Sequence, residues 1–213
     1  MNASFEKKAG LALIIFTILM VFTMVLHPAG GSVEHLIRIS NRIIITHAIA
    51  ILSLPFGWIG FWGLTRKIGT EHFTSMLGFA MISLGIIAVM IAAATNGLVM
   101  PFFLQHYKDA DPETLNSIRP ILRYSFAINH AFDYIYTGGF SLAMLCWSIA
   151  ILRTRKLAAW IGWIGIALCI VALIITTVGV NTLLGFRLFA GSIVLWILLV
   201  GIDLYKQKSQ PAS

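Results

Sequence analysis

Charged residues are scarce in this 213-residue chain, where Asp, Glu, Lys and Arg together make up only 11% of the sequence. Soluble domains carry about 25% charged and about 45–50% apolar residues, whereas 59% of this chain is hydrophobic. The composition therefore excludes an ordinary soluble domain, a disordered chain and a nucleic-acid-binding domain. Only two cysteines are present, which excludes a disulfide-stabilised scaffold.

Several sequence motifs with known chemistry are also missing. The chain has no Walker A motif, no dinucleotide-binding glycine fingerprint and no Cys-x-x-Cys-His haem attachment. It also lacks the compact His-x-x-x-His or Cys-x-x-Cys spacing that identifies a zinc site. Nucleotide chemistry of these types is therefore not indicated, and any bound haem would be non-covalent.

Long apolar stretches are what the sequence does contain. Crossing a bilayer takes about 20 helical residues, and six stretches qualify, at about 9–26, 43–64, 73–100, 126–152, 157–182 and 188–205. The first exceeds the apolar core of about 7–15 residues in a secretory signal, so we expect it to be retained. The sequence predicts an all-α bundle of six transmembrane helices, forming one membrane domain over residues 1–213.

Basic residues predict how this bundle is oriented. Nine fall at one end of the predicted helices, namely Lys7, Lys8, Arg66, Lys67, Arg153, Arg155, Lys156, Lys206 and Lys208, and six at the other. Short positive loops stay in the cytoplasm, so both termini are predicted to be cytoplasmic, in what we expect to be a bacterial cytoplasmic membrane. The six tryptophans lie toward the same side, and most are interpreted as interfacial anchors.

The second and third stretches resemble the fourth and fifth. Thr46-His47-Ala48 corresponds to Asn129-His130-Ala131, and Thr65-Arg66-Lys67 corresponds to Thr154-Arg155-Lys156. This pattern is consistent with a tandem repeat of helix hairpins. The positive-inside rule alone also explains a basic turn at each place.

The two longer outer loops carry helix-start signals. Ser32 precedes a predicted short helix over 33–39, and Asp111-Pro112-Glu113 places a capping acid before a proline and a second acid. Their apolar residues predict that both helices lie in the membrane interface. A lid over an outer site and a plain connecting loop are both consistent with this pattern.

Polar side chains inside the predicted helices concentrate near their outer ends. Such residues are costly in a membrane and normally face a bundle interior or a cavity. They include His27, His47, Asn96, Asn129, His130, Asp133 and Asn181. His47 and His130 lie near the outer ends of helices running in the same direction, which predicts that they share one depth and one outward-facing pocket.

The fourth predicted helix carries a polar stripe. His130, Asp133, Thr137 and Ser141 are spaced by three, four and four residues, so they share one face. This spacing brings the Asp133 carboxylate close to the His130 ring. Asp133 is therefore the candidate catalytic residue, which orients the imidazole or accepts a proton. The alternative is that Asp133 pairs with an outer arginine and only pins helices together.

Our leading hypothesis from the sequence is a b-type haem or a transition metal, zinc or copper, held between His47 and His130 for redox or metal-assisted chemistry. His47, His130 and Asp133 are the candidate metal ligands. Asn96 and Asn181 are expected to hydrogen-bond the bound species. Arg187 is expected to pair, together with Arg38, Arg42, Arg119 and Arg123, with haem propionates or an anionic head group.

Two other functions fit the same residues. In the first, the pocket binds or transports a small lipophilic or anionic molecule, or a lipid, without catalysis. In the second, the polar groups only satisfy one another in a structural or immunity-type membrane protein. Met20, Met24, Met90 and Met100 are interpreted as gap-filling residues, although thioethers are also soft metal ligands.

Overall fold

The structure is a computed structural model that describes residues 3–27, 30–178 and 183–206, with side chains for 5–27, 30–172, 174 and 187–206. These residues form helices joined by turns and contain no strand. In chain order the elements are α1 (Ala3–Leu26), α2 (Val33–Arg38), α3 (Ser40–Ile68), α4 (Phe73–Ala94), the π-helix η1 (Thr95–Val99), α5 (Met100–Gln105), α6 (Pro112–Ser117), α7 (Arg119–Thr154), α8 (Ala159–Val178) and α9 (Leu183–Lys206).

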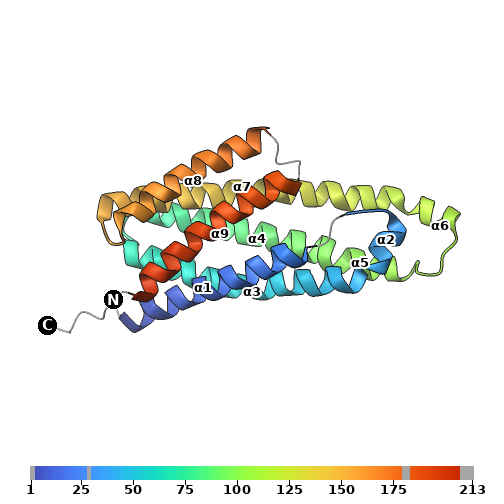
Figure 1. Cartoon of the computed structure of the whole chain (residues 1–213), viewed down its shortest axis with the longest axis horizontal. Coiled ribbons are helices and arrows are strands. Elements are labelled where there is room, and N and C mark those ends of the chain that lie inside the picture. The colour runs from blue at the N-terminus through green and yellow to red at the C-terminus, as the bar shows by residue number, and fades with distance from the viewer. Residues whose placement is uncertain (1–2, 28–29, 179–182, 207–213) are drawn as a thin grey trace.

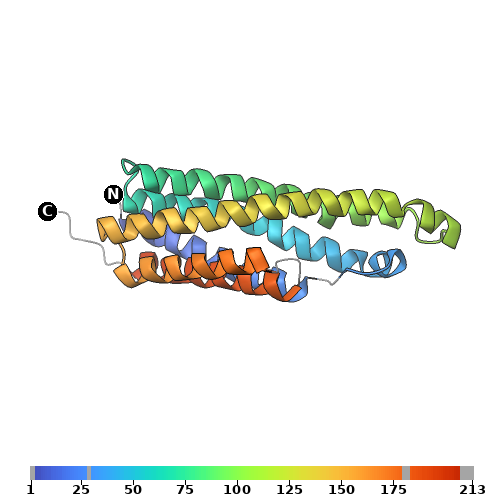
Figure 2. The same cartoon turned by 90° about the horizontal axis from the view of Figure 1, so that it is seen from above.

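The long helices run side by side along one axis (Figures 1 and 2). α4 packs mainly on α7, α1 packs on α3 and α9, and α8 packs on α7 and α9. The start of α1 and the end of α9 lie together at one end of the bundle, while α2, α5 and α6 gather at the opposite end (Figure 1). The all-α prediction is confirmed for the described residues.

Five helical segments are long and apolar enough to cross a membrane: Phe5–Leu26, Ser40–Ile68, Phe73–Gln105, Pro112–Thr154 and Arg187–Lys206. They correspond to five of the six predicted crossings. The remaining prediction, 157–182, corresponds to α8, whose stretch Ala159–Ala172 is a shorter apolar helix.

The helices differ greatly in length, and this shapes one end of the bundle. We call the end that carries α2, α5 and α6 the outer end. α7 has 36 residues and α3 has 29, which at 1.5 Å per residue makes them about 54 and about 44 Å long. α1 and α9 have 24 residues each and α8 has 20. Since each of these helices has one terminus at the same end of the bundle, the longer helices continue past the other ends of the shorter ones.

Small residues bring α1 and α3 into close contact. Gly57, Gly60 and Gly63 lie on the face of α3 that meets Phe16, Leu13 and Ala9 of α1. A Cβ atom at any of these glycines would press on the facing α1 side chain. This glycine series is a packing surface, since small residues let helix backbones approach closely.

Charged and aromatic side chains tie the basic end together. Lys67 Nζ lies 2.9 Å from Glu6 Oε2, in an ion pair between α3 and α1. Lys7 lies over the ring of Tyr205, with 5.0 Å between Nζ and the ring centroid. These contacts bring the start of α1, the end of α3 and the end of α9 to one level, as the clustering of basic residues predicts.

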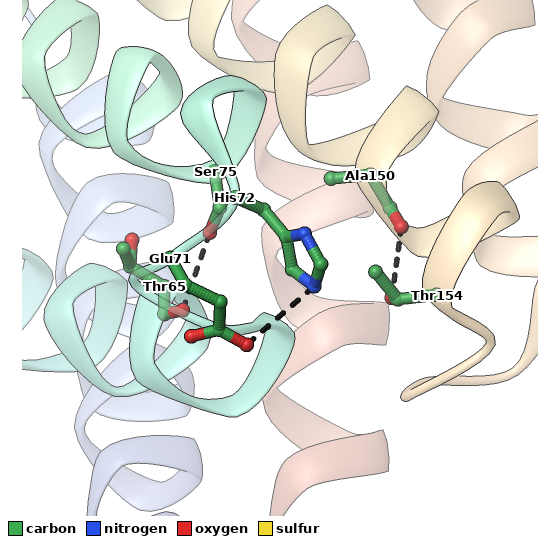
Figure 3. Close-up of polar contacts among 6 residues, drawn as sticks. All are labelled: Thr65, Glu71, His72, Ser75, Ala150 and Thr154. Atoms are coloured by element: carbon green, nitrogen blue, oxygen red, sulfur yellow. Dashed lines mark hydrogen bonds and ion pairs between the residues drawn. The ribbon is translucent and has the colours of Figure 1, made fainter.

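The two Thr-Arg-Lys turns can be compared at this end. Thr65 and Thr154 each bond back to the carbonyl four residues earlier, Thr65 to Phe61 at 2.9 Å and Thr154 to Ala150 at 2.8 Å (Figure 3 shows the second bond). α3 nevertheless continues to Ile68, whereas α7 ends at Thr154 itself. The helix ends are therefore out of register, and the similar local bonding adds no support for a duplication.

The turn between α3 and α4 has its own contacts (Figure 3). Ser75 Oγ donates to the Thr65 carbonyl at 3.2 Å, and His72 Nε2 lies 3.6 Å from Glu71 Oε1. The hydroxyl of Ser75 thereby joins the first turn of α4 to the last turns of α3. This bond satisfies a buried hydroxyl and fixes the hairpin.

An aromatic stack forms the centre of the core. The Trp147 ring of α7 lies between Phe61 of α3 and Trp196 of α9, with centroid distances of 5.3 and 6.3 Å and interplanar angles of 15° and 12°. The Trp196 indole N–H donates to the Ile161 carbonyl of α8 at 3.2 Å. These two tryptophans are buried core residues, so they are not among the interfacial anchors. Trp160 and Trp163 are more than half exposed, as interfacial anchors are.

The predicted caps of the outer short helices are present. Ser32 Oγ accepts from the His35 N–H at 3.3 Å, and Asp111 Oδ1 accepts from the Thr114 N–H at 2.9 Å. This backbone hydrogen bond holds the pKa of the Asp111 carboxyl below its usual range. Both caps therefore start their helices where the sequence predicts.

Several apolar residues of these short helices pack within the protein. Leu36, Leu115 and Ile118 are buried in a second small core that also contains Met100 and Leu104 of α5. The outer ends of α3, α5 and α7 are therefore covered by α2 and α6. The location of these helices in a membrane interface stays a prediction, since Ile121 remains 51% exposed.

Replacement of Trp147 by alanine tests the aromatic stack. Loss of a fully buried aromatic side chain costs about 3–5 kcal/mol, so we expect Trp147→Ala to lower the unfolding midpoint strongly in detergent. Trp163→Ala is the matched control, since Trp163 is 63% exposed. Thermal unfolding followed by tryptophan fluorescence measures both, and equal losses would contradict the assignment of Trp147 to the core.

Candidate functional site

A cavity of about 260 Å³ lies among α1, α3, α4, α7 and α9. Most of its wall is apolar and consists of Phe16, Met20, Met24, Ala50, Val89, Ala92, Ala93, Phe140, Phe189, Ala190, Ile193, Val194 and Ile197. Its polar lining residues are Thr23, His27, His47, Asn129, Asp133 and Tyr136. A mostly apolar cavity with a few polar groups is the usual form of a small-molecule site.

The polar lining residues share a depth along the bundle. At 1.5 Å per residue, His27 lies about 33 Å from Phe5 along α1, and Asp133 lies about 32 Å from Thr154 along α7. His47 lies about 27 Å from Thr65 along α3. Each distance is close to the hydrocarbon thickness of a bilayer, about 30 Å. The polar groups therefore lie one membrane thickness from the basic end.

His47 is held in one orientation by its own helix. Its Nδ1 lies 2.8 Å from the Ile43 carbonyl oxygen, which can only accept, so Nδ1 carries the proton and donates. The other ring nitrogen, Nε2, is then left with a lone pair when the ring is neutral. The sequence-predicted residue His47 is thus a cavity-lining imidazole with a fixed tautomer.

The histidine closest to His47 is His27, not the expected His130. The ring centroids of His27 and His47 are 5.3 Å apart, with an angle of 58° between the planes. Arg42 and Thr46 of α3 bring this about, because both donate to the Leu26 carbonyl at the end of α1, at 3.1 and 3.4 Å. Arg42 therefore caps a helix C-terminus, whereas the sequence suggested that it binds an anionic group.

His130 lies outside the cavity. Its side chain is 54% exposed, and its ring packs edge-on against Tyr134 at 4.9 Å. His130 Nδ1 lies 3.9 Å from Asp133 Oδ2, which is too far for a hydrogen bond. The i,i+3 spacing does make the two residues neighbours, but it does not place the imidazole beside His47.

Asp133 faces the cavity together with a different neighbour. The Asn129 side-chain amide donates to Asp133 Oδ2 at 3.2 Å and Oδ1 at 3.4 Å. The polar stripe that faces inward is therefore Ser125, Asn129 and Asp133, spaced by four residues. The predicted stripe shares Asp133 with this one but began at His130 instead of Asn129, because both residues have helical spacing to Asp133 and only the packing of α7 distinguishes them.

A π-helix shapes the wall behind His47. In η1 the added residue widens the turn, and Gly97 lies directly against the His47 ring, with no room for a Cβ atom. Thr95 Oγ1 donates to the Ile91 and Ala92 carbonyls at 2.9 and 3.1 Å. The hydroxyl thereby inserts into the backbone hydrogen-bond pattern where the helix changes. Such π-bulges occur frequently at functional sites, and no sequence signal predicts this one.

Asn96 is positioned by the same π-helix. Its side chain is buried, and its Oδ1 accepts from Ser125 Oγ of α7 at 2.9 Å. Its Nδ2 finds no hydrogen-bond acceptor among the residues that the structure describes. Asn96 thus links η1 to the polar stripe of α7, but it does not line the cavity itself.

Two predicted site residues remain, Arg187 and Asn181. Arg187 is exposed near the start of α9, two residues before the cavity-lining Phe189. Asn181 lies outside the described residues. Within the described part of the chain, no group of three or more His, Cys, Asp or Glu side chains is close enough to hold a metal ion. The expected ligand set of His47, His130 and Asp133 is therefore not assembled.

Comparison with known proteins does not assign the chain to a family. No protein-family model, no curated protein and no solved structure matches the chain.

Exchange of Gly97 for alanine tests the packing of the π-helix on His47. A Cβ atom there overlaps the imidazole, so we expect Gly97→Ala to destabilise the protein by about 1–3 kcal/mol, as overpacking does. Gly138→Ala is the control, since a Cβ atom at Gly138 meets nothing within 4 Å, and helix propensity predicts an unchanged or slightly higher stability. Thermal unfolding in detergent separates the two outcomes.

Proposed function

We propose that the chain is an integral membrane protein that crosses the bilayer six times, with both termini on one side. Five segments have the length and hydropathy that this requires. α8, with 20 residues, is about 30 Å long, which is one hydrocarbon thickness. The clustering of basic residues at the shared end of α1, α3 and α9 supports a cytoplasmic location for that end.

Accessibility labelling tests this topology. In a Cys146→Ala, Cys169→Ala background, single cysteines are introduced by Arg155→Cys at the basic end and by Asp109→Cys near α6. Both positions are exposed. In intact cells, a membrane-impermeant maleimide should label only the Asp109→Cys protein. Labelling of both positions, or of Arg155→Cys alone, would contradict the proposed orientation.

We infer that the cavity binds a small amphipathic molecule. The observation that carries this proposal is the composition of its wall, in which apolar residues of five helices surround a few polar groups at one depth. An apolar body then rests among side chains such as Phe140 and Ile193, while a polar group reaches His47 and Asp133. The depth of these residues, near one membrane boundary, suits a molecule that enters from the lipid.

The cavity volume sets the size of this molecule. A cavity of about 150 Å³ is enough for benzene, and drug-sized ligands occupy about 300–1,000 Å³. The 260 Å³ found here lies between these values. It favours a molecule larger than benzene and smaller than haem, so a haem is not part of this proposal.

The polar end of the cavity favours a ligand that donates hydrogen bonds. Asp133 accepts from Asn129 but has lone pairs to spare. Asp133 has no hydrogen bond from His130 at 3.9 Å, so the contacts support binding of a hydroxyl or amino group more directly than proton transfer by an Asp–His pair. Catalysis by Asp133 is therefore not included in the proposed function.

Filling the cavity tests this binding. Ala93 lines the cavity, and Ala93→Leu adds three carbons to the wall. We expect the variant to bind 1-decanol and decylamine at least ten-fold more weakly than the parent protein. Native mass spectrometry of protein released from phosphatidylethanolamine–phosphatidylglycerol nanodiscs measures the bound fraction.

Ala80→Leu serves as the matched control, because Ala80 is exposed on the same helix. It should bind both probes as the parent does. Equal probe binding by the parent, Ala93→Leu and Ala80→Leu proteins would show that the probes do not occupy the cavity, and would contradict the proposal.

A further inference from the structure

The end of the cavity where α1 meets α3 brings together a group of nitrogen and sulfur side chains. Met20 and Met24 of α1, His27 directly after α1, and His47 of α3 all line it. Met24 precedes His27 by three residues, a spacing that places side chains on one side of a helix. Of these four residues the organic-ligand proposal uses only His47, and Met20 also packs against the core.

The separation of the two imidazoles suits a shared ion. With metal–nitrogen bonds of about 2.0–2.1 Å, two imidazoles on one ion in a bent arrangement have ring centroids about 5–5.5 Å apart. The observed distance between the His27 and His47 centroids is 5.3 Å, with a tilt of 58°.

His47 has the hydrogen bond that metal-binding histidines use. Its Nδ1–H donates to the Ile43 carbonyl at 2.8 Å, which fixes the tautomer and leaves Nε2 free to coordinate. Nearly all histidines that bind a metal donate the N–H of the other ring nitrogen to a carboxylate, a backbone carbonyl or water in this way. The capping of Leu26 by Arg42 and Thr46 holds the end of α1, and with it His27, beside this ring.

The donor set decides which ion fits. No third His, Cys, Asp or Glu joins the two imidazoles among the described residues, so zinc would lack its usual set of four ligands. Thioethers and imidazoles together favour monovalent copper. The unbranched methionine side chain is flexible enough to turn its sulfur toward an ion between the two rings.

We propose that His27, His47 and Met24 form a binding site for monovalent copper at this end of the cavity, with Met20 as a further thioether ligand. The site differs from the His47–His130 pair expected from the sequence, since His130 lies outside the cavity. It shares His47 with the organic-ligand proposal but does not rest on that proposal, because copper requires only the α1–α3 end.

Competition with a chromophoric chelator tests the copper site. The full-length protein in detergent is titrated anaerobically into the Cu(I)–bicinchoninate complex, and the loss of absorbance reports copper transfer. We expect the parent to withdraw one ion per chain. His27→Ala, His47→Ala and Met24→Leu should each weaken the affinity at least ten-fold, and copper X-ray absorption should show sulfur among the ligands.

Two matched variants serve as controls. His130→Ala removes an exposed histidine at a similar depth, and Met90→Leu removes a methionine that is 45% exposed, so both should keep the parent affinity. His27→Ala keeps the test interpretable if His47→Ala fails to fold, because His27 is an exposed residue just beyond α1.

Three results would overturn the copper site: no transfer from bicinchoninate, transfer that persists in His27→Ala, or Zn(II) binding as tight as copper binding and unaffected by Met24→Leu. The Ala93→Leu protein separates this proposal from the first. Ala93 is not a proposed ligand, so its substitution should abolish decanol binding while copper transfer remains.

Discussion

Unequal helix length is the constraint on which the outer half of this protein depends. α1 ends at Leu26, while α3 and α7 continue beyond it. A helix that stops beside longer neighbours leaves carbonyl groups without intrahelical donors. Arg42 and Thr46 supply donors to Leu26 from the side of α3. The same contacts place His27 against His47 and define one wall of the cavity, so the cap and the site have a common origin.

The two halves of the bundle differ in how closely they are packed. The inner half is the one that contains the start of α1 and the end of α9. The inner half is closely packed by glycines on α3 and by the stack of Phe61, Trp147 and Trp196. The outer half contains the cavity, the π-helix η1 and the short polar stripe of α7. Rigid packing of one half can hold the ends of five helices in place around a void in the other. The groups that line the cavity are therefore separate from the packed core that stabilises the fold.

The polar residues of the site are organised in two separate chains of contact. One runs from Ile43 through His47 to His27, and the other from Asn96 through Ser125 along α7 to Asn129 and Asp133. They meet at η1, where Gly97 lies against His47 and Asn96 bonds α7. A change at the π-helix is therefore expected to affect both. This arrangement supports distinct roles for the two ends of the cavity.

The sequence by itself determined the helical class, five of the membrane-length segments, the caps at Ser32 and Asp111 and the depth of the polar residues, because each of these depends on local composition and spacing. It did not determine which histidines meet. Helical periodicity makes His130 and Asn129 equally good candidates for the inner face of α7, and nothing local shows that α1 ends beside His47. Only tertiary packing decided that His27 is the partner, that Trp147 and Trp196 lie in the core, and that Gly97 of η1 lies against His47, since each depends on contacts between residues far apart in the chain.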